Sequence, residues 1–363
     1  MTLDAYFARK FFWSVMLVFS IFLVLLALID LVDELQDFPN LPFGSVLEIV
    51  LLNVPADNYE ILPLVIVLAT TGLYIRLARS SELVVVRATG RSALRSLAAP
   101  IMVALMLGIL AVTMLNPIVA ASSKRYNDLV NSHIGGGAAI LVIASEGLWL
   151  RQGSPEGQTV IHAERASSDL TVLFDTTFID FDPDGQPAQR IMANAARLSK
   201  GEWMLYDAKI WDLSRGENPE AAAETAETMR LSSALTQDRI IDTFGKPEYI
   251  PIWDLPRFID QLDQAGFSAR RYAMWFQMEL ARPLFMVALV MISAAFTMRH
   301  ARLSNTGISV LAAVLLGFGL HYIRNFAQIL GENGEIPILL AAWAPPVASI
   351  LLATGLLLHM EDG

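Results

Sequence analysis

Long runs of uncharged apolar residues constrain the fold of this sequence more than any other feature. A membrane-spanning helix needs about 20 mostly apolar residues, and the run Phe11–Ile29 supplies 19 without a charge. A composition of 54% hydrophobic and 17% charged residues is likewise too apolar for an ordinary soluble domain. Three runs lie near each end of the sequence, which predicts an α-helical membrane protein with six transmembrane helices in a three-plus-three arrangement. The six runs are Phe11–Ile29, Ile61–Ile75, Leu97–Leu115, Pro283–Met298, Gly307–Ile323 and Ile336–Leu358.

Prolines and flanking residues refine three of these helices. The fourth helix is expected to begin before its apolar run, near Tyr272. The apolar stretch Val46–Val54 precedes Pro55, which predicts an interfacial helix or an early part of the second span, broken near this proline. The pair Pro345–Pro346 predicts a kink in the sixth helix, since proline removes a helical hydrogen bond.

Basic residues predict the orientation of the helices. Arginine and lysine in short loops concentrate on the cytoplasmic side of a membrane. The loops 30–45 and 331–335 hold four and two acidic residues and no base, so they are expected to face outward. Both termini are therefore expected in the cytoplasm, and residues 119–270 on the outer side. The basic residues on the expected cytoplasmic side are Arg9, Lys10, Arg76, Arg79, Arg87, Arg91, Arg95, Arg299 and Arg302.

The segment 119–270 separates the helical regions 1–118 and 271–363 and is long enough for a domain of its own. Its pattern is β, because apolar residues alternate along Leu170–Phe181. Short strands between turn signals are typical of a sandwich, a jelly roll or a partly open barrel. The acidic, alanine-rich stretch Asn218–Glu227 is expected to be a loop. Further strands are expected at Val160–Arg165 and Glu202–Leu213, and a short helix at Pro256–Gly266.

Motifs of common enzymes are missing from this sequence. Its one Gly–Lys pair lies in Gly245–Pro247 and lacks the upstream glycine spacing of a phosphate-binding loop. The absence of cysteine excludes disulfides, iron–sulfur clusters and thiolate zinc sites. Asp180, Asp182 and Asp184 alternate like a calcium loop without its glutamate, so we interpret them as a polar turn. We therefore expect a protein that is no enzyme and binds no metal or cofactor, and a net charge of −10 argues against nucleic-acid binding.

The basic loop between the second and third spans contains a short helix with its own start and stop signals. A serine at position 80 or 81 can cap the helix, Glu82 suits the positive end of its dipole, and Gly90 supplies a stop. Its consecutive apolar residues cannot all face one side. The pattern fits an interfacial helix that rests on lipid headgroups and equally a coupling helix inserted into a groove of a cytoplasmic partner.

The run Ser81–Gly90 resembles the SELxxxxAxG signature of the lipopolysaccharide export permeases, the LptF/LptG family. Val54–Pro55 and Leu62–Pro63 match the same family, and Glu146–Trp149 is nearer to its LptG branch than to its LptF branch. The three-plus-three arrangement around an outward β-domain matches as well. The resemblance covers nearly the whole chain.

This resemblance implies a permease subunit of an ATP-driven exporter in a bacterial inner membrane. The family implies an LptF-like partner permease and two copies of an LptB-like cytoplasmic ATPase, which uses ATP and Mg. It also implies a periplasmic jelly-roll domain that passes lipopolysaccharide to a bridge of LptC-like and LptA-like proteins. The first and fifth spans would form lateral gates, at 11–29 and 307–324.

The resemblance also implies two groups of site residues. Lys124 and Arg125 would contact the lipid headgroup, although ordinary surface charge explains them as well. Arg324 would be either a headgroup contact or an interfacial anchor whose charge reaches toward water. Residues expected to couple to the ATPase are Ser81, Glu82, Leu83, Val86 and Arg87. Residues expected near the headgroup are Asp30, Asp33, Lys124, Arg125 and Arg324.

The outer end of the first span departs from the family, whose members often carry basic residues there. Four carboxylates, at Asp30, Asp33, Glu34 and Asp37, would repel a phosphate unless divalent cations bridge them. Either the headgroup is less anionic, or the partner permease supplies the basic contacts.

Three other interpretations fit parts of the sequence. The chain could be the LptF-type subunit or an exporter of another lipid or of a lipoprotein. A membrane scaffold or sensor would keep the β-domain without transport, and copurification with an ATPase would separate these classes. An intramembrane enzyme would need paired ionisable residues inside the spans, which the uninterrupted apolar runs disfavour.

Overall fold

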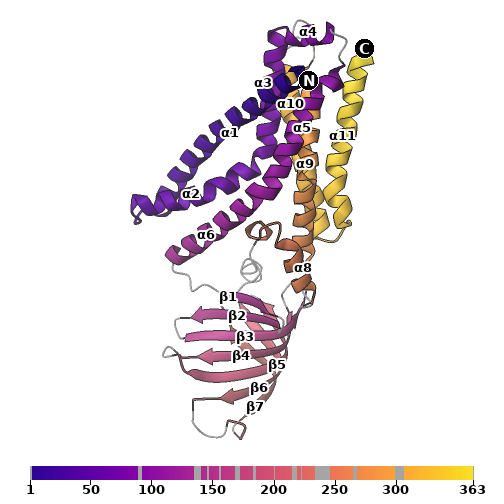
Figure 1. The fold of residues 1–363 in the computed structure, drawn as a ribbon. Helices are drawn as coiled ribbons and strands as arrows, with labels where there is room; N and C mark the ends of the chain where they lie inside the picture. The colour runs from indigo at the N-terminus through magenta and orange to yellow at the C-terminus, as the bar shows by residue number, and fades with distance from the viewer. Residues whose placement is uncertain are drawn as a thin grey trace. The chain divides into compact units, whose positions relative to one another are not determined.

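The computed structural model divides the chain into two compact units. A helical unit contains residues 1–127, 248–253 and 272–363, and a mainly β unit contains 128–247 and 254–271 (Figure 1). The structure describes residues 2–88, 92–134, 140–144, 147–154, 157–167, 172–182, 185–199, 201–214, 219–221, 223–233, 246–264, 268–298 and 306–362. Outside these ranges lie Gly90, Arg91, Glu146, Leu170, Asp184, Asn218, Gly245, Gly266, Arg299 and Arg302, which the sequence analysis named.

Six helices are long and apolar enough to cross a membrane within the described residues, which confirms the predicted three-plus-three arrangement. Three lie on each side of the strands in the sequence. These spans and the shorter helical segments before and after the strands are α1 (Thr2–Asp37), α2 (Phe43–Glu60), α3 (Leu62–Arg79), α4 (Glu82–Ala88), α5 (Ala93–Leu110), the π-helical η1 (Ala111–Leu115), α6 (Asn116–Ile134), α9 (Arg270–Thr297), α10 (Thr306–Glu332) and α11 (Ile338–Asp362). The third candidate span runs through α5, η1 and α6.

The break that precedes the second span lies at a different residue from the predicted one. Pro55 lies inside α2, so the predicted break near this residue is wrong. The chain instead turns at Ile61, and Pro63 lies in the first turn of α3. The first turn tolerates proline because its N–H groups have no helical partner in any case. A new helix therefore starts easily at this second proline.

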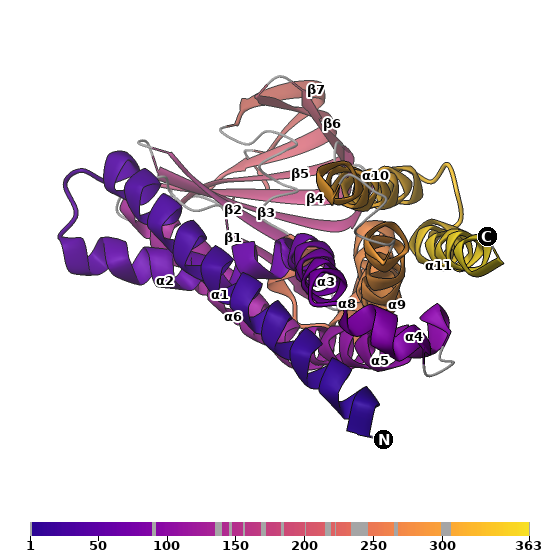
Figure 2. The ribbon, with the colours of Figure 1, turned by 90° about the horizontal axis from the view of Figure 1, so that it is seen from above.

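Helix α9 forms the centre of the helical unit. In its most apolar stretch 78% of the residues are buried, against 6% in α1. Figure 2 shows α9 between α3, α5, α10 and α11. Helix α1 buries one edge through Phe7, Phe11 and Val15 and leaves a broad apolar face uncovered within the chain. The exposed side chains of this face are Trp13, Leu17, Ile21, Val24 and Leu28.

The β unit is a seven-stranded antiparallel sheet in which each described strand pairs with its neighbour in the sequence. The β-domain prediction is confirmed, but this sequential order is that of a meander, and the described strands lack the crossovers of a jelly roll. Strand β7 begins at Glu224, so the predicted loop over 218–227 is too long. The elements are β1 (Ile140–Ala144), β2 (Gly147–Ser154), β3 (Gly157–Ala166), β4 (Val172–Phe181), β5 (Pro187–Ser199), β6 (Glu202–Asp212), β7 (Glu224–Ser232), the short η2 (Pro247–Tyr249) and α8 (Leu255–Gln264).

One face of the sheet is apolar along a row that crosses the strands. Leu150 pairs with Ile161, Ile161 with Phe178, and Phe178 with Ile191. All four side chains are buried. The row follows from the period-two alternation that predicted strands from the sequence.

The boundary between the two units differs from the predicted start of the outer domain at residue 119. Helix α6 continues to Ile134, and its first part packs with the helical unit as far as residue 127. The return segment 248–253 also belongs to the helical unit. The predicted third span ends with its apolar run. The helix continues through the polar residues of α6, because a helix need not end where its apolar run ends.

Candidate functional site

Helix α4 begins with a sharp turn that the SEL sequence makes. Ser81 has a φ of 61°, which is the left-handed region that non-glycine residues seldom adopt. The turn separates α3 from α4, and Glu82 is the first residue of α4. This confirms a short helix in the basic loop as far as Ala88. Its predicted end at Gly90 lies outside the described residues.

The Glu82 carboxylate binds α1. The Tyr6 hydroxyl donates to Oε2 at 2.7 Å, and the Lys10 ammonium lies 3.0 Å from both carboxylate oxygens. The Ser80 hydroxyl donates to Oε1 at 3.0 Å. Partial burial favours the neutral acid, but these three donors and the lysine charge outweigh it and lower the pKa of Glu82 below its ordinary value. Glu82 is therefore a charged group whose main partners come from the first helix.

The apolar residues of α4 divide between two sides. Leu83 and Val86 are each 5% exposed and belong to the core of the helical unit. Val85 is 63% exposed, and Ser81 is also exposed. The Arg87 side chain lies outside the described residues. Of the residues expected to couple to an ATPase, Leu83 and Val86 thus face inward, whereas Val85 offers an outward apolar contact that the prediction omitted.

The acidic residues near the end of α1 differ in their surroundings. Glu34 is buried and accepts a 2.7 Å hydrogen bond from the Tyr126 hydroxyl. Asp30 is half-buried, whereas Asp33 is exposed beside an open groove of about 570 Å³ along the apolar face of α1. No group of three or more carboxylates and histidines suited to a metal ion occurs among the residues with defined positions. Lys124 and Arg125 are both exposed on α6.

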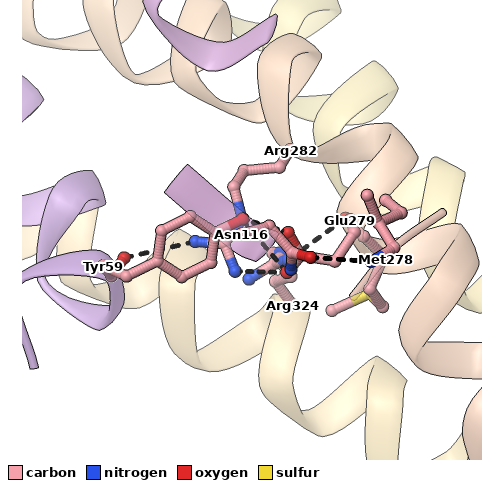
Figure 3. Close-up of polar contacts among 7 residues, drawn as sticks. Tyr59, Asn116, Met278, Glu279, Arg282 and Arg324 are labelled. Atoms are coloured by element: carbon pink, nitrogen blue, oxygen red, sulfur yellow. Dashed lines mark hydrogen bonds and ion pairs between the residues drawn. The ribbon is translucent and has the colours of Figure 1, made fainter. Parts of the chain in front are cut away.

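A buried polar network joins α2, α9 and α10 (Figure 3). The Tyr59 hydroxyl donates to the Glu279 carboxylate, and the Arg282 guanidinium donates to both of its oxygens, with Nε at 3.1 and 3.2 Å. The same guanidinium lies 4.1 Å from the centre of the Tyr59 ring. Arg324 on α10 donates to the Met278 carbonyl at 3.3 Å. The network ties the central helix α9 to its neighbours on either side.

The network buries more positive than negative charge. It contains two guanidinium groups and one carboxylate, and Glu279, Arg282 and Arg324 are 0%, 5% and 6% exposed. The predictions for Arg324 placed it at the surface, as a headgroup contact or an interfacial anchor, but here it is enclosed by α9 and α10. It also lies 5.3 Å over the ring of Phe285. Burial of a charge without partners is costly, so each of these contacts helps to stabilise the buried charge that makes it.

Sequence reasoning missed most of this network. Glu279 and Arg282 are an i,i+3 pair of opposite charge directly before Pro283, where the apolar run begins. A charge pair at that spacing inside a predicted helix was a usable signal. Tyr59 carried no such signal, because it meets Glu279 across 220 residues of sequence.

A second polar contact fixes the return segment 248–253 to the third span. Pro117 has no N–H, so the Thr113 carbonyl four residues earlier lacks its α-helical donor. The Trp253 indole N–H donates to this carbonyl at 3.3 Å. The buried N–H of Ile252 donates to the Asn116 side chain at 2.9 Å. The irregular π-helical turn thus serves as a docking point.

Asn116→Leu is expected to destabilise the helical unit by about 1–3 kcal/mol, because the buried N–H of Ile252 then loses its acceptor. The midpoint of thermal unfolding measures the effect. Trp253→Phe serves as the control with a smaller expected shift, since this indole is 65% exposed. Equal midpoints for Asn116→Leu and the native chain would contradict the docking role.

Two comparisons place the chain among known proteins. The family model described as "Lipopolysaccharide export system permease LptF/LptG" matches residues 5–359. The chain is similar to the "Lipopolysaccharide export system permease protein LptG" of Escherichia coli strain K12, with 22% identity over 312 residues, or 85% of this chain and 84% of the relative. The protein of the same name from Escherichia coli O6:H1 shows the same identity and coverage.

Proposed function

Because the chain belongs to the lipopolysaccharide export permease family LptF/LptG, we propose that it extracts lipopolysaccharide from the inner membrane with energy from a partner ATPase. As a member of this family it is a multi-pass inner-membrane permease subunit of the lipopolysaccharide export system, and it is not itself an enzyme. The steps that follow concern its orientation, its energy source, its path for lipid and its partners.

The orientation we propose places α4 and both termini in the cytoplasm. Figure 1 shows α4 at the same end of the helical unit as the two termini. Arg76 and Arg79 end α3, and Arg95 begins α5, so basic residues flank α4 on both sides. This agrees with the preference of short basic loops for the cytoplasm. An odd number of crossings before the β unit then puts that unit in the periplasm.

The energy source we propose is a pair of LptB-like ATPase subunits that bind ATP and Mg. The sequence contains no phosphate-binding loop of its own, so the chain needs such a partner. The observation that carries this step is the geometry of α4, a short helix between two spans that exposes Val85 while Leu83 and Val86 hold it in the core. Closure of the ATPase pair would then move α4 and, through it, the spans.

The lipid path we propose begins at the uncovered apolar face of α1. Exposure of one 14-carbon chain to water costs on the order of 10 kcal/mol, so the lipid must travel along a continuous apolar surface. The face from Trp13 to Leu28, with its open groove, supplies such a surface. An LptF-like permease would enclose the other side. The apolar row of the β unit would continue the path toward LptC-like and LptA-like bridge proteins.

Coexpression with a candidate partner permease and ATPase tests this function. We expect a stable complex whose ATP hydrolysis rises when lipopolysaccharide is added. A chain that binds no ATPase would instead favour the scaffold or sensor interpretation. Stimulation by another lipid and not by lipopolysaccharide would favour a different substrate.

Val85→Asp is expected to lower the amount of copurified ATPase at least tenfold. An unpaired carboxylate buried in an interface costs several kcal/mol, and each 1.4 kcal/mol corresponds to a factor of about ten in binding. Val85 is 63% exposed, so the chain itself should fold normally. Val85→Thr keeps the branched shape and serves as the matched control. Full copurification of the aspartate variant would mean that α4 is not the ATPase contact.

A further inference from the structure

We propose that Tyr6 and Lys10 of α1 are positioning residues that fasten α4 to the first span through Glu82. In this arrangement the glutamate of the SEL sequence works inside the chain and passes the movement of α4 directly to α1. The proposal rests on the proposed function in one respect, namely that α4 receives movement from an ATPase.

Residues of α1 and residues just before α4 both hold the Glu82 carboxylate. Tyr6 and Lys10 are one helical turn apart, so they share a face of α1. The Lys10 ammonium lies 4.4 Å over the Tyr6 ring, and both groups reach the same carboxylate. On the other side, the Ser80 hydroxyl and the left-handed turn at Ser81 fix the start of α4. Glu82 is therefore held by three donors from two elements.

Apolar residues accompany this polar contact. Phe7 and Phe11 of α1 and Leu83 and Val86 of α4 are all buried and belong to one core cluster. The ion pair itself is only partly covered, since the side chains of Lys10 and Glu82 are 31% and 34% exposed. Exposed ion pairs contribute little to stability. Loss of this pair should therefore impair the link between helices more than it impairs folding.

The position of α1 explains how a link to α4 would affect the apolar face along which we propose that lipid moves. Helix α1 carries the large uncovered apolar face and the open groove of the helical unit. A displacement of α4 that reaches α1 would move this face relative to α9 at the centre. The pair of Lys10 and Glu82 bridges 72 residues of sequence and bypasses α2 and α3.

Charge exchange in the complete complex tests the link. The readout is lipopolysaccharide released per ATP hydrolysed by proteoliposomes that contain this chain, the partner permease and the ATPase. Lys10→Glu and Glu82→Lys should each lower this ratio at least tenfold while the ATPase still copurifies. The double exchange should restore it to within about threefold, and Tyr6→Phe should lower it less than either reversal. Arg9→Glu, an exposed neighbour with the same charge change, should leave it unchanged.

Three results would overturn the proposal. These are an unchanged ratio in both single reversals, a double exchange that restores nothing, and loss of the ATPase from the Glu82→Lys complex, which would assign Glu82 to the partner interface.

A crosslink gives a readout that needs no transport. The chain has no cysteine, so Lys10→Cys with Glu82→Cys should react with a short bifunctional maleimide in native membranes, whereas Arg9→Cys with Glu82→Cys should not. Crosslinking without any transport by the native complex would preserve the link and refute the proposed function instead.

Discussion

Glu279→Ala is expected to lower the free energy of unfolding by about 3–5 kcal/mol, the usual effect of removing one member of a buried ion pair. Glu279 is fully buried and is the carboxylate partner of Arg282 and Tyr59. Without it, the guanidinium groups of Arg282 and Arg324 would remain in the interior with no counter-charge among the described residues of the network. The shift of the thermal unfolding midpoint of the purified complex measures this effect.

The arginines of the same network should rank below Glu279. Arg282→Met removes the ion-pair partner of the buried carboxylate and leaves it the Tyr59 hydroxyl as a donor, so we expect a large loss of stability. Arg324→Met removes the excess charge and one 3.3 Å bond to a carbonyl, so we expect a small loss or a gain. Glu335→Ala, at an exposed carboxylate, serves as the control and should stay within about 0.5 kcal/mol. An unfolding midpoint of Glu279→Ala equal to that of this control would contradict the structural role of the network.

Gly108→Ala is expected to destabilise the helical unit by about 1–3 kcal/mol, because overpacking a tight contact forces its neighbours apart. A Cβ at Gly108 in α5 would lie 2.6 Å from the Cα and 2.9 Å from the Cβ of Pro283 in α9. Backbone and a proline ring cannot rotate away as a flexible side chain can. The two helices would have to separate, and α9 is the helix on which the others pack.

The matched control for this substitution is Gly355→Ala in α11. A Cβ there meets nothing within 4 Å, so the change should stabilise the helix by up to about 1 kcal/mol. Thermal unfolding of both variants in the same detergent gives the comparison. Equal stability of the two variants would mean that α5 and α9 do not approach as closely as described.

The spans were predictable because hydrophobicity is a local property of the sequence. The uncharged run Phe11–Ile29 located α1, but the helix continues from Thr2 to Asp37 through charged residues that the run excluded. Strand β4 lies within the alternating run Leu170–Phe181, and β6 lies within the predicted strand Glu202–Leu213. The end of α6 and the place of the break at Ile61 depend on which residues pack against them, and that information is not local.

The site was predictable in the same limited sense. The run Ser81–Gly90 indicated a short helix, and the structure describes one from Glu82 to Ala88. The partners of Glu82 lie 72 and 76 residues away, beyond the reach of any local pattern. Arg324 resembled a surface anchor because its own segment ends an apolar run, whereas its burial is set by α9. Contacts between distant helices are therefore the part that only the fold supplies.

The most direct measurement is the release of labelled lipopolysaccharide from proteoliposomes that contain this chain with the proposed partner permease and the proposed ATPase. Release is followed after addition of ATP and Mg, with a periplasmic acceptor protein in solution. We predict release that requires ATP and falls at least tenfold when this chain is left out or carries Val85→Asp. Hydrolysis of ATP without release of lipopolysaccharide in the complete system would contradict the assignment of this chain as the exporting permease.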